Sequence, residues 1–357
     1  MDTPKVAIII LNWNGWKDAI ECLESVFRID YPNYQVIVVN NGSTDDSVEK
    51  IKAWAEGRQE VLTPEPTHPL YHLSHPPVQK PIPYIEYDRK TAEAGGLPEK
   101  EKLLYEKLPK DIPHLMILIQ TGDNLGFAGG NNVGIRYVLK RKFEYIWLLN
   151  NDTVVHQEAL KLMVQQYEKQ AKLGIVGSII SYYDFPEKIW FRGGRLNYCL
   201  GGGFHIGKNK ILLDENLSKN KLVSCDFVTG CSMLIRKEIF GDLNGFDDKF
   251  FLNYEDIDFC GRVKRRGWII GFVDYPLIYH KVSVSQIRNN SFLIYHVNRS
   301  RIIWIRKTIL VEKRLIIGLL FFLLSRVMII LKLVLKYKGR GMFSIIKGVI
   351  DGFKVSI

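Results

Sequence analysis

The sequence predicts an α/β fold built on a doubly wound sheet. The first 180 residues alternate short aliphatic runs, each ending in a polar turn, with segments whose apolar residues recur at helical spacing. This alternation is typical of strand–helix–strand units, and the continuous aliphatic runs indicate parallel strands buried on both faces. With 357 residues, 46% of them hydrophobic and 24% charged, the chain is long enough for one large domain or two ordinary ones, and a disordered chain is excluded.

The elements follow from these runs in order along the chain. Each expected strand is a β-rich run, and each expected helix begins after a polar turn. The helix after the second strand has three candidate capping residues, Ser43, Thr44 and Asp45. The expected strands are 6–11, 34–39, 115–120, 145–149 and 175–180, and the expected helices are 17–29, 46–55, 133–140, 157–171 and 292–310.

The segment 57–118 interrupts this pattern. It contains 10 of the 14 prolines and four of the eight histidines, and proline at this density disfavours regular helix or sheet. We expect a largely irregular insertion with one short helix near 99–107. His68, His72 and His75 lie close together, but without an acidic or thiol ligand in a defined spacing a metal site is disfavoured.

The charge is distributed unevenly. The whole chain carries +11, but residues 281–357 hold 15 Lys and Arg against two acidic residues, so the rest of the chain is at −2. The basic residues of this tail alternate with aliphatic runs and form no known nucleic-acid motif, so no nucleic-acid partner is expected. We expect one or two amphipathic helices lying on an anionic membrane surface, with a short or re-entrant membrane helix and a soluble helical hairpin as alternatives.

The cysteines and the N-terminus give weaker signals. The five cysteines are odd in number and none pairs in a Cys-x-x-Cys spacing, which favours buried thiols in a reducing compartment. The N-terminus lacks the layout of a signal peptide.

Four polar turns follow expected strands, at 12–15, 40–45, 123–132 and 150–153. Ligands of open parallel sheets bind at the carboxyl ends of strands. The turns lack the dinucleotide and P-loop glycine patterns. Asn and Gly also form ordinary tight turns, but four turns at successive strand ends favour a binding site for a nucleoside.

Two acidic positions are candidates for chemistry. Asp152 follows a strand and suits a divalent cation that stays largely bound to substrate phosphates, although it is also a candidate N-cap for the next helix. Glu255, Asp256 and Asp258 lie among aromatic residues, where desolvation would raise the pKa of a carboxylate acting as general base. His280 is a structural histidine or a further metal ligand.

These motifs together resemble the inverting glycosyltransferases of family 2, which have the GT-A fold, and most of all their rhamnosyltransferase-like branch. The resemblance covers residues 5–285 outside the insertion, and it rests on the order and spacing of six motifs. The matching segments are 6–14 (VAIIILNWN), 36–47 (VIVVNNGSTDDS), 124–134 (NLGFAGGNNVG), 148–153 (LLNNDT), 228–230 (VTG) and 253–262 (NYEDIDFCGR), with His280.

The resemblance implies a role for each matching residue. Asp256, in the Glu255–Asp256 pair, would be the catalytic base, and Asp152 with His280 would hold Mg²⁺ or Mn²⁺. The residues implied to line the nucleotide sugar are Leu11, Asn12, Asn14, Asn40, Asn41, Gly42, Ser43, Asn124, Gly126, Phe127, Gly130, Asn131, Asn150 and Asn151. Asn40 and Asn150 depart from the family, which usually has aspartate at both positions.

The implied organisation is a GT-A domain over residues 1–285, a Rossmann-like doubly wound mixed sheet that contains the 57–118 insertion. A membrane-association region follows over residues 286–357. The implied reaction is metal-dependent, inverting transfer of rhamnose or a similar hexose from a dTDP- or UDP-linked donor to a lipid-linked or polymeric glycan. The expected setting is the cytoplasmic face of the cell membrane, peripheral or monotopic, in polysaccharide biosynthesis of the cell envelope. A homo-oligomer is left open, and the alternative function is a non-catalytic scaffold that binds nucleotide or glycan.

Overall fold

The computed structural model describes residues 3–61, 64–108, 114–212, 217–282, 291–337 and 341–357. Its strands are β1 (Val6–Asn12), β2 (Tyr34–Asn40), β3 (Tyr84–Asp88), β4 (Met116–Gln120), β5 (Tyr145–Asn150), β6 (Thr153–Val155), β7 (Leu173–Tyr182), β8 (Ile189–Phe191), β9 (Gly194–Asn197), β10 (Gly202–His205), β11 (Ser218–Ser224), β12 (Ser232–Arg236) and β13 (Ile269–His280). Its helices are α1 (Trp16–Val26), α2 (Ser47–Ala55), α3 (Tyr71–Ser74), α4 (Arg89–Glu93), α5 (Pro98–Glu106), α6 (Gly126–Leu139), α7 (Ala159–Lys169), η1 (Tyr198–Leu200), α8 (Lys237–Leu243), α9 (Glu255–Arg265), α11 (Ser291–Ile309), α12 (Leu315–Tyr337) and α13 (Met342–Lys354).

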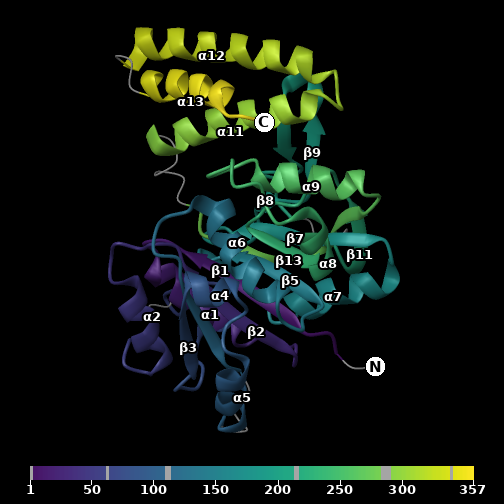
Figure 1. Cartoon of the computed structure of the whole chain (residues 1–357). Coiled ribbons are helices and arrows are strands. Elements are labelled where there is room, and N and C mark those ends of the chain that lie inside the picture. The colour runs from purple at the N-terminus through teal and green to yellow at the C-terminus, as the bar shows by residue number, and fades with distance from the viewer. Residues whose placement is uncertain (1–2, 62–63, 109–113, 213–216, 283–290, 338–340) are drawn as a thin grey trace.

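One mixed sheet of 11 strands forms the centre of the molecule (Figure 1). Its order is β11-β13-β7-β12-β5-β1-β2-β4-β3, with β6 paired to β13 and β8 to β7. The five strands from β5 to β3 are mutually parallel, whereas β12 runs antiparallel to both β5 and β7. The doubly wound mixed sheet predicted from the sequence is therefore confirmed.

The core lies where the parallel strands are fully covered. Strands β1 and β2 are buried along almost their whole length, as their continuous aliphatic runs predict. The five expected strands and the helices at 17–29, 46–55, 157–171 and 292–310 are confirmed to within three residues at each end. The parallel register brings the ends of β5, β1, β2 and β4 to one edge of the sheet, so the four polar turns lie side by side.

Three expectations need correction. Helix α6 begins at Gly126 instead of residue 133, because the Gly- and Asn-rich segment forms the first two helical turns instead of a loop. The insertion contains more regular structure than expected: α5 confirms the predicted short helix, and β3, which was not predicted, adds a parallel edge strand to the sheet. Cys199 is exposed, whereas the other four cysteines are buried thiols as expected.

Helices α11, α12 and α13 form a separate layer at one side of the sheet domain (Figure 1). Helix α12 continues through Ser325 and Arg326 without a break over 23 residues. Within the described ranges, no helix combines the length and apolarity needed to cross a bilayer.

Candidate active site

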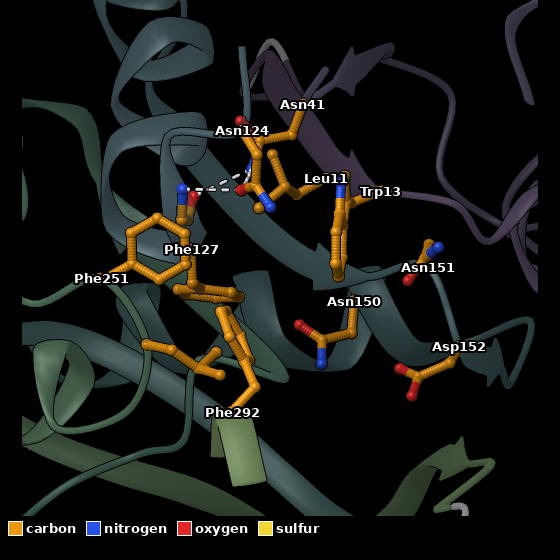
Figure 2. Close-up of a pocket in the computed structure, with 12 residues that line it drawn as sticks. Leu11, Trp13, Asn41, Asn124, Phe127, Asn150, Asn151, Asp152, Phe251 and Phe292 are labelled. Carbon is orange, nitrogen blue, oxygen red and sulfur yellow. Dashed lines mark hydrogen bonds between the residues drawn. The ribbon is translucent and has the colours of Figure 1, made fainter. Parts of the chain in front are cut away.

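A cavity of about 240 Å³ opens at the carboxyl ends of β1, β2 and β5 (Figure 2). Eight of the predicted site residues line it: Leu11, Asn41, Asn124, Gly126, Phe127, Asn150, Asn151 and Asp152. Figure 2 shows Phe127, Phe251 and Phe292 gathered at one side, and the polar Asn150 and Asp152 at the other. The cavity therefore has an aromatic wall and an amide and carboxylate wall.

The predicted residues outside this lining hold the turns together. Asn12 is fully buried and accepts a hydrogen bond from Asn151 (2.9 Å). Ser43, in the turn that also contains Gly42, accepts one from the backbone N–H of Asn14 (3.0 Å). These bonds join the ends of β5, β1 and β2, so Asn12, Asn14 and Ser43 shape the cavity from behind.

Asn41 connects the end of β2 to the start of α6. Its Nδ2 donates to Asn124 Oδ1 (3.0 Å) and to the Gly126 carbonyl (3.1 Å), and its Oδ1 accepts from the Leu125 N–H (3.1 Å). Gly126 has a φ of +72°, and a Cβ there would lie 2.3 Å from the Phe251 carbonyl oxygen. Glycine at 126 therefore lets the start of α6 meet the loop before α9.

The next turn of α6 packs closely on the ends of β1 and β2. A Cβ at Gly130 would lie 2.6 Å from Leu11 and 2.9 Å from Asn41, so only glycine permits this approach. Asn131 donates from Nδ2 to the Phe127 carbonyl (2.9 Å), which keeps its side chain on its own helix. Both residues fix the position of α6 at the edge of the cavity.

Asn40 has a defined amide orientation. Its Nδ2 donates to Gln120 Oε1 (2.8 Å), and Gln120 Nε2 donates to Glu86 Oε1 (2.9 Å). Glu86, which also pairs with Lys52 (2.5 Å), is a carboxylate and only accepts. Glu86 therefore fixes the amide of Gln120, and Gln120 fixes the amide of Asn40, so that Asn40 Oδ1 is left as an acceptor. This buried oxygen has no partner among the described residues.

Asp152 and His280 meet at the polar end of the cavity. His280 is the last residue of β13, and its Nε2 lies 3.1 Å from Asp152 Oδ2. Burial alone would raise the pKa of Asp152, but the charge and hydrogen bond of His280 hold it below its usual value. Asp152 Oδ1 is buried without a partner within the described part of the chain, so one carboxylate oxygen is available for a ligand.

Glu255 and Asp256 begin α9 after a strained turn. Asn253 and Tyr254 both have φ near +65° (+64° and +69°), a conformation that costs non-glycine residues energy and is concentrated at functional sites. Asp256 Oδ2 accepts from the Gly230 N–H (3.0 Å), and Gly230 packs against Phe127 of the cavity wall. Asp256 therefore lies next to the aromatic side of the cavity, although it is not one of the lining residues.

Burial gives Glu255 and Asp256 higher pKa values than ordinary surface acids have. It raises the pKa of Asp256 despite the backbone hydrogen bonds that the side chain accepts. Burial, together with the charge of Asp256, raises the pKa of Glu255 well above its usual value. Asp258 differs, because it forms ion pairs with Arg262 (2.8 Å) and Lys307 (2.7 Å), which gives it a structural role.

The raised pKa of Glu255 predicts a pH-dependent stability. A carboxyl group whose pKa is higher in the folded chain stabilises the fold below its unfolded pKa of about 4.3, and this contribution is lost as the pH rises through the folded value. In Glu255→Gln we expect the free energy of unfolding to decline less than in wild type as the pH rises. The difference should be about 1.4 kcal/mol for each unit by which folding raises the pKa of Glu255. Urea unfolding at a series of pH values measures this effect, with the exposed Glu238→Gln as control. Parallel curves for wild type and Glu255→Gln would contradict it.

Four lining residues were not predicted: Trp13, Phe251, Leu252 and Phe292. Trp13 follows the first strand directly and is 49% exposed. A large aromatic residue in a polar turn was the sequence feature that could have identified it as a lining residue. Phe251 and Leu252 precede α9, and Phe292 is in the first turn of α11. Nothing in their local pattern indicates that they reach a cavity at the ends of β1 and β5.

The donor groups fit a weakly held divalent cation. Within the described ranges, His, Cys, Asp and Glu do not gather in groups of three or more that could bind a metal. The available set is the free oxygen of Asp152, the amide oxygens of Asn150 and Asn151, and the His280 imidazole once it has lost the proton that its contact with Asp152 favours. One carboxylate with neutral oxygens is typical of a cation that takes its remaining ligands from substrate phosphates and water.

A cavity lined by amides and a carboxylate at the carboxyl ends of the strands is where an open α/β sheet binds its ligand. The profile of glycosyl transferase family 2 matches residues 7–65 and 103–243. This match covers more than half of the chain, and the chain belongs to glycosyl transferase family 2.

Two relatives illustrate the range of the family. The chain is 28% identical over 192 residues to the low-salt glycan biosynthesis hexosyltransferase Agl10 of Haloferax volcanii, covering 51% of this chain and 58% of that protein. It is 27% identical over 181 residues to the rhamnosyltransferase WbbL of Escherichia coli, covering 48% of this chain and 66% of that protein. The chain thus spans about three fifths of the length of these relatives.

Solved structures share the fold. GalNAc-T7 with UDP, GalNAc and Mn²⁺ superimposes with a TM-score of 0.53 at 12% identity, covering 84% of this chain and 48% of that one. The mannosyltransferase PcManGT of Pyrobaculum calidifontis with GDP-Man and Mn²⁺ gives 0.51 at 13% identity, covering 99% and 87%. At these identities the likeness establishes the GT-A architecture alone.

Proposed function

We propose that this protein transfers a hexose, rhamnose or a similar sugar, from a nucleotide sugar to a hydroxyl group of a lipid-linked or polymeric glycan, with inversion at the anomeric carbon. The observation that carries the proposal is one cavity lined by Asp152 and the amide-rich strand ends, with Asp256 next to its aromatic wall. Family membership and the hexosyl- and rhamnosyltransferase names of the relatives support the sugar class.

The orientation of Asn40 supports a uracil or thymine base in the donor. Both bases present an imino N–H donor, which matches the unpartnered Asn40 Oδ1, whereas cytosine presents a lone pair at the same ring position. The aromatic face of Trp13 at the cavity mouth offers a stacking surface for a base (Figure 2). These features favour dTDP- and UDP-linked donors.

The reaction follows from the positions of the acids. Asp256 takes the proton of the acceptor hydroxyl, and the oxygen forms a bond to the anomeric carbon from the face opposite the leaving group. The bond from that carbon to the diphosphate oxygen breaks, and the electron pair stays on the diphosphate. The raised pKa of Asp256 makes its carboxylate a stronger base than an exposed aspartate.

The leaving diphosphate needs compensation of its charge. Asp152, with His280 beside it, would hold Mg²⁺ or Mn²⁺, which supplies positive charge to the diphosphate when bound. The presence of Mn²⁺ with a sugar nucleotide or UDP in GalNAc-T7 and PcManGT supports this choice of metal.

Thermal shift with nucleoside diphosphates tests the donor. In the presence of Mn²⁺ we expect UDP and dTDP to raise the melting temperature of the full chain more than CDP or ADP, whose bases present a lone pair at the matching ring nitrogen. Glu86→Gln should reduce the preference of the protein for UDP over CDP by about tenfold, because the orientation of Asn40 is then no longer fixed and a misdirected buried hydrogen bond costs about 1–3 kcal/mol.

The matched control is Glu60→Gln, an exposed acidic residue in the same insertion, which should keep the base preference of wild type. A chain that no nucleoside diphosphate stabilises would contradict the donor proposal. An unchanged preference for UDP over CDP in Glu86→Gln would contradict the role of the Glu86–Gln120–Asn40 chain alone.

A further inference from the structure

Helix α12 carries a continuous apolar stripe on its outer face. The exposed members recur every three or four residues, which places them on one side of the helix. Leu324 and Met328, at the middle of the stripe, are 67% and 68% exposed. The exposed apolar residues of α12 are Ile316, Ile317, Leu320, Phe321, Leu324, Val327, Met328 and Leu331. Isolated exposed apolar residues are ordinary, but a stripe of this length indicates an interaction surface.

Helix α13 and the turn before α12 also carry exposed apolar residues. Phe343, Ile346, Ile350 and Phe353 of α13 are exposed and also recur every three or four residues, with Phe343 at 73%. Leu310 and Val311 are exposed in the turn that joins α11 to α12. Figure 1 shows α12 and α13 on the side of α11 that faces away from the sheet.

The sequence of α12 and α13 is strongly cationic, and its one acidic residue is Asp351 near the end of α13. Between Lys313 and Ile350 there are eight Lys and Arg and no acidic residue. Arg326, the cation that interrupts the apolar run, is directed inward: it donates to Asn298 Oδ1 of α11 (3.2 Å) and lies 4.9 Å from the centre of the Phe322 ring. The outer stripe of α12 is therefore not broken by Arg326.

We propose that the outer faces of α12 and α13 dock in the interface of an anionic phospholipid bilayer, parallel to its plane. Exposed aliphatic side chains enter the acyl boundary, and the cations meet anionic headgroups. Charge complementarity favours this occupant, because the sequence of this region has a net positive charge, and a second copy of the chain would bring like charges together. The surface lies on the membrane without crossing it.

Docking through α12 and α13 also determines how far the cavity at the ends of β1, β2 and β5 lies from the bilayer. Helix α13 packs on α11, where Tyr295 donates to Asp351 (2.9 Å) and Arg306 donates to the Gly352 carbonyl (3.0 Å). Helix α11 reaches the cavity, because Phe292 in its first turn lines it. It also holds the loop before Glu255, through a hydrogen bond from Ser300 to the Leu252 carbonyl (2.9 Å). The cavity therefore lies close to the bilayer, within reach of a lipid-linked acceptor.

Vesicle flotation of the full chain tests the docking surface. We expect wild type to float with phosphatidylcholine vesicles that contain phosphatidylglycerol and to float less with phosphatidylcholine alone. The double variant Leu324→Asp/Met328→Asp should lower the bound fraction at least about tenfold, because it places two acidic groups in the stripe. High salt should weaken wild-type binding by screening the headgroup attraction.

The matched control is Leu103→Asp/Ile211→Asp, which makes the same change at two exposed aliphatic residues outside α11–α13; it should float like wild type. Circular dichroism of both variants confirms that they fold. Wild type that stays unbound, or a Leu324→Asp/Met328→Asp variant that floats fully, would overturn the proposal. Dimerisation of wild type that this variant abolishes, without vesicle binding, would show that a second copy covers the face and would overturn it as well. No donor is present, so the result is independent of the proposed reaction.

Discussion

Asp256→Asn is expected to lower the rate of hexosyl transfer by about 10²-fold or more, because an amide cannot take the proton of the acceptor hydroxyl. Asparagine has nearly the shape of aspartate, and its oxygen can still accept from the Gly230 N–H as Asp256 does. The dissociation constant for the nucleoside diphosphate should therefore change little. Steady-state transfer and calorimetric titration on the same preparation measure the two effects.

The control for this variant is Asp242→Asn, which changes an exposed aspartate on α8 and should transfer at the wild-type rate. The pH profile adds a second criterion. Because burial raises the pKa of Asp256, wild-type transfer should rise with pH through a value above that of an ordinary aspartate. A variant with wild-type transfer would show that another group is the base.

Asp152→Asn is expected to lower metal-dependent transfer by about 10²–10³-fold, the usual effect of removing one group that stabilises the charge of a leaving group. Asp152 is the carboxylate at the polar end of the cavity that keeps an unpartnered oxygen within the described structure. Unlike Asp256→Asn, this variant should also weaken binding of the nucleoside diphosphate in Mn²⁺ while leaving binding in EDTA nearly unchanged.

Titrating the diphosphate in Mn²⁺ and in EDTA separates metal binding from general damage to the cavity. Asp242→Asn again serves as control and should retain the full Mn²⁺ effect. If Asp152→Asn keeps the Mn²⁺ enhancement of binding, Asp152 is not the metal carboxylate. If it loses binding equally in both buffers, its main role is to hold His280 and β13 in place.

The sequence was sufficient to predict what depends on local pattern. Continuous aliphatic runs located β1, β2 and β5, and the register of parallel strands then brought their polar turns together. It also placed Asp152 and His280 among the metal candidates, 128 residues apart, and the structure joins them at 3.1 Å. That prediction relied on the resemblance to family 2, since a lone histidine after an apolar run has no distinctive local signal.

Other features depend on contacts between distant segments. Gly126 and the asparagines after it look like a turn, but docking against Phe251 and packing on β1 make them the start of α6. β3 lies in a proline-rich segment, and only its pairing with β4 makes it a strand. Glu86 therefore could not be recognised in advance as the residue that orients Asn40.

The C-terminal tail also combines features that the sequence predicts with features that depend on distant contacts. Its net charge and aliphatic runs are evident in the sequence, and they predicted amphipathic helices. The direction of Arg326 was not predictable, because it depends on Asn298 in α11, a neighbour 28 residues away. Phe292 likewise reaches the cavity only because α11 lies against the loop before α9.

The proposed transfer is tested most directly by measuring release of nucleoside diphosphate from dTDP- and UDP-hexoses by the full chain, with Mn²⁺ and lipid-linked glycan acceptors in anionic vesicles. We expect release that requires both metal and acceptor, and that stops in Asp256→Asn. A protein that binds the donor under these conditions but releases no diphosphate would instead be a nucleotide- or glycan-binding scaffold, which would contradict the proposed transfer.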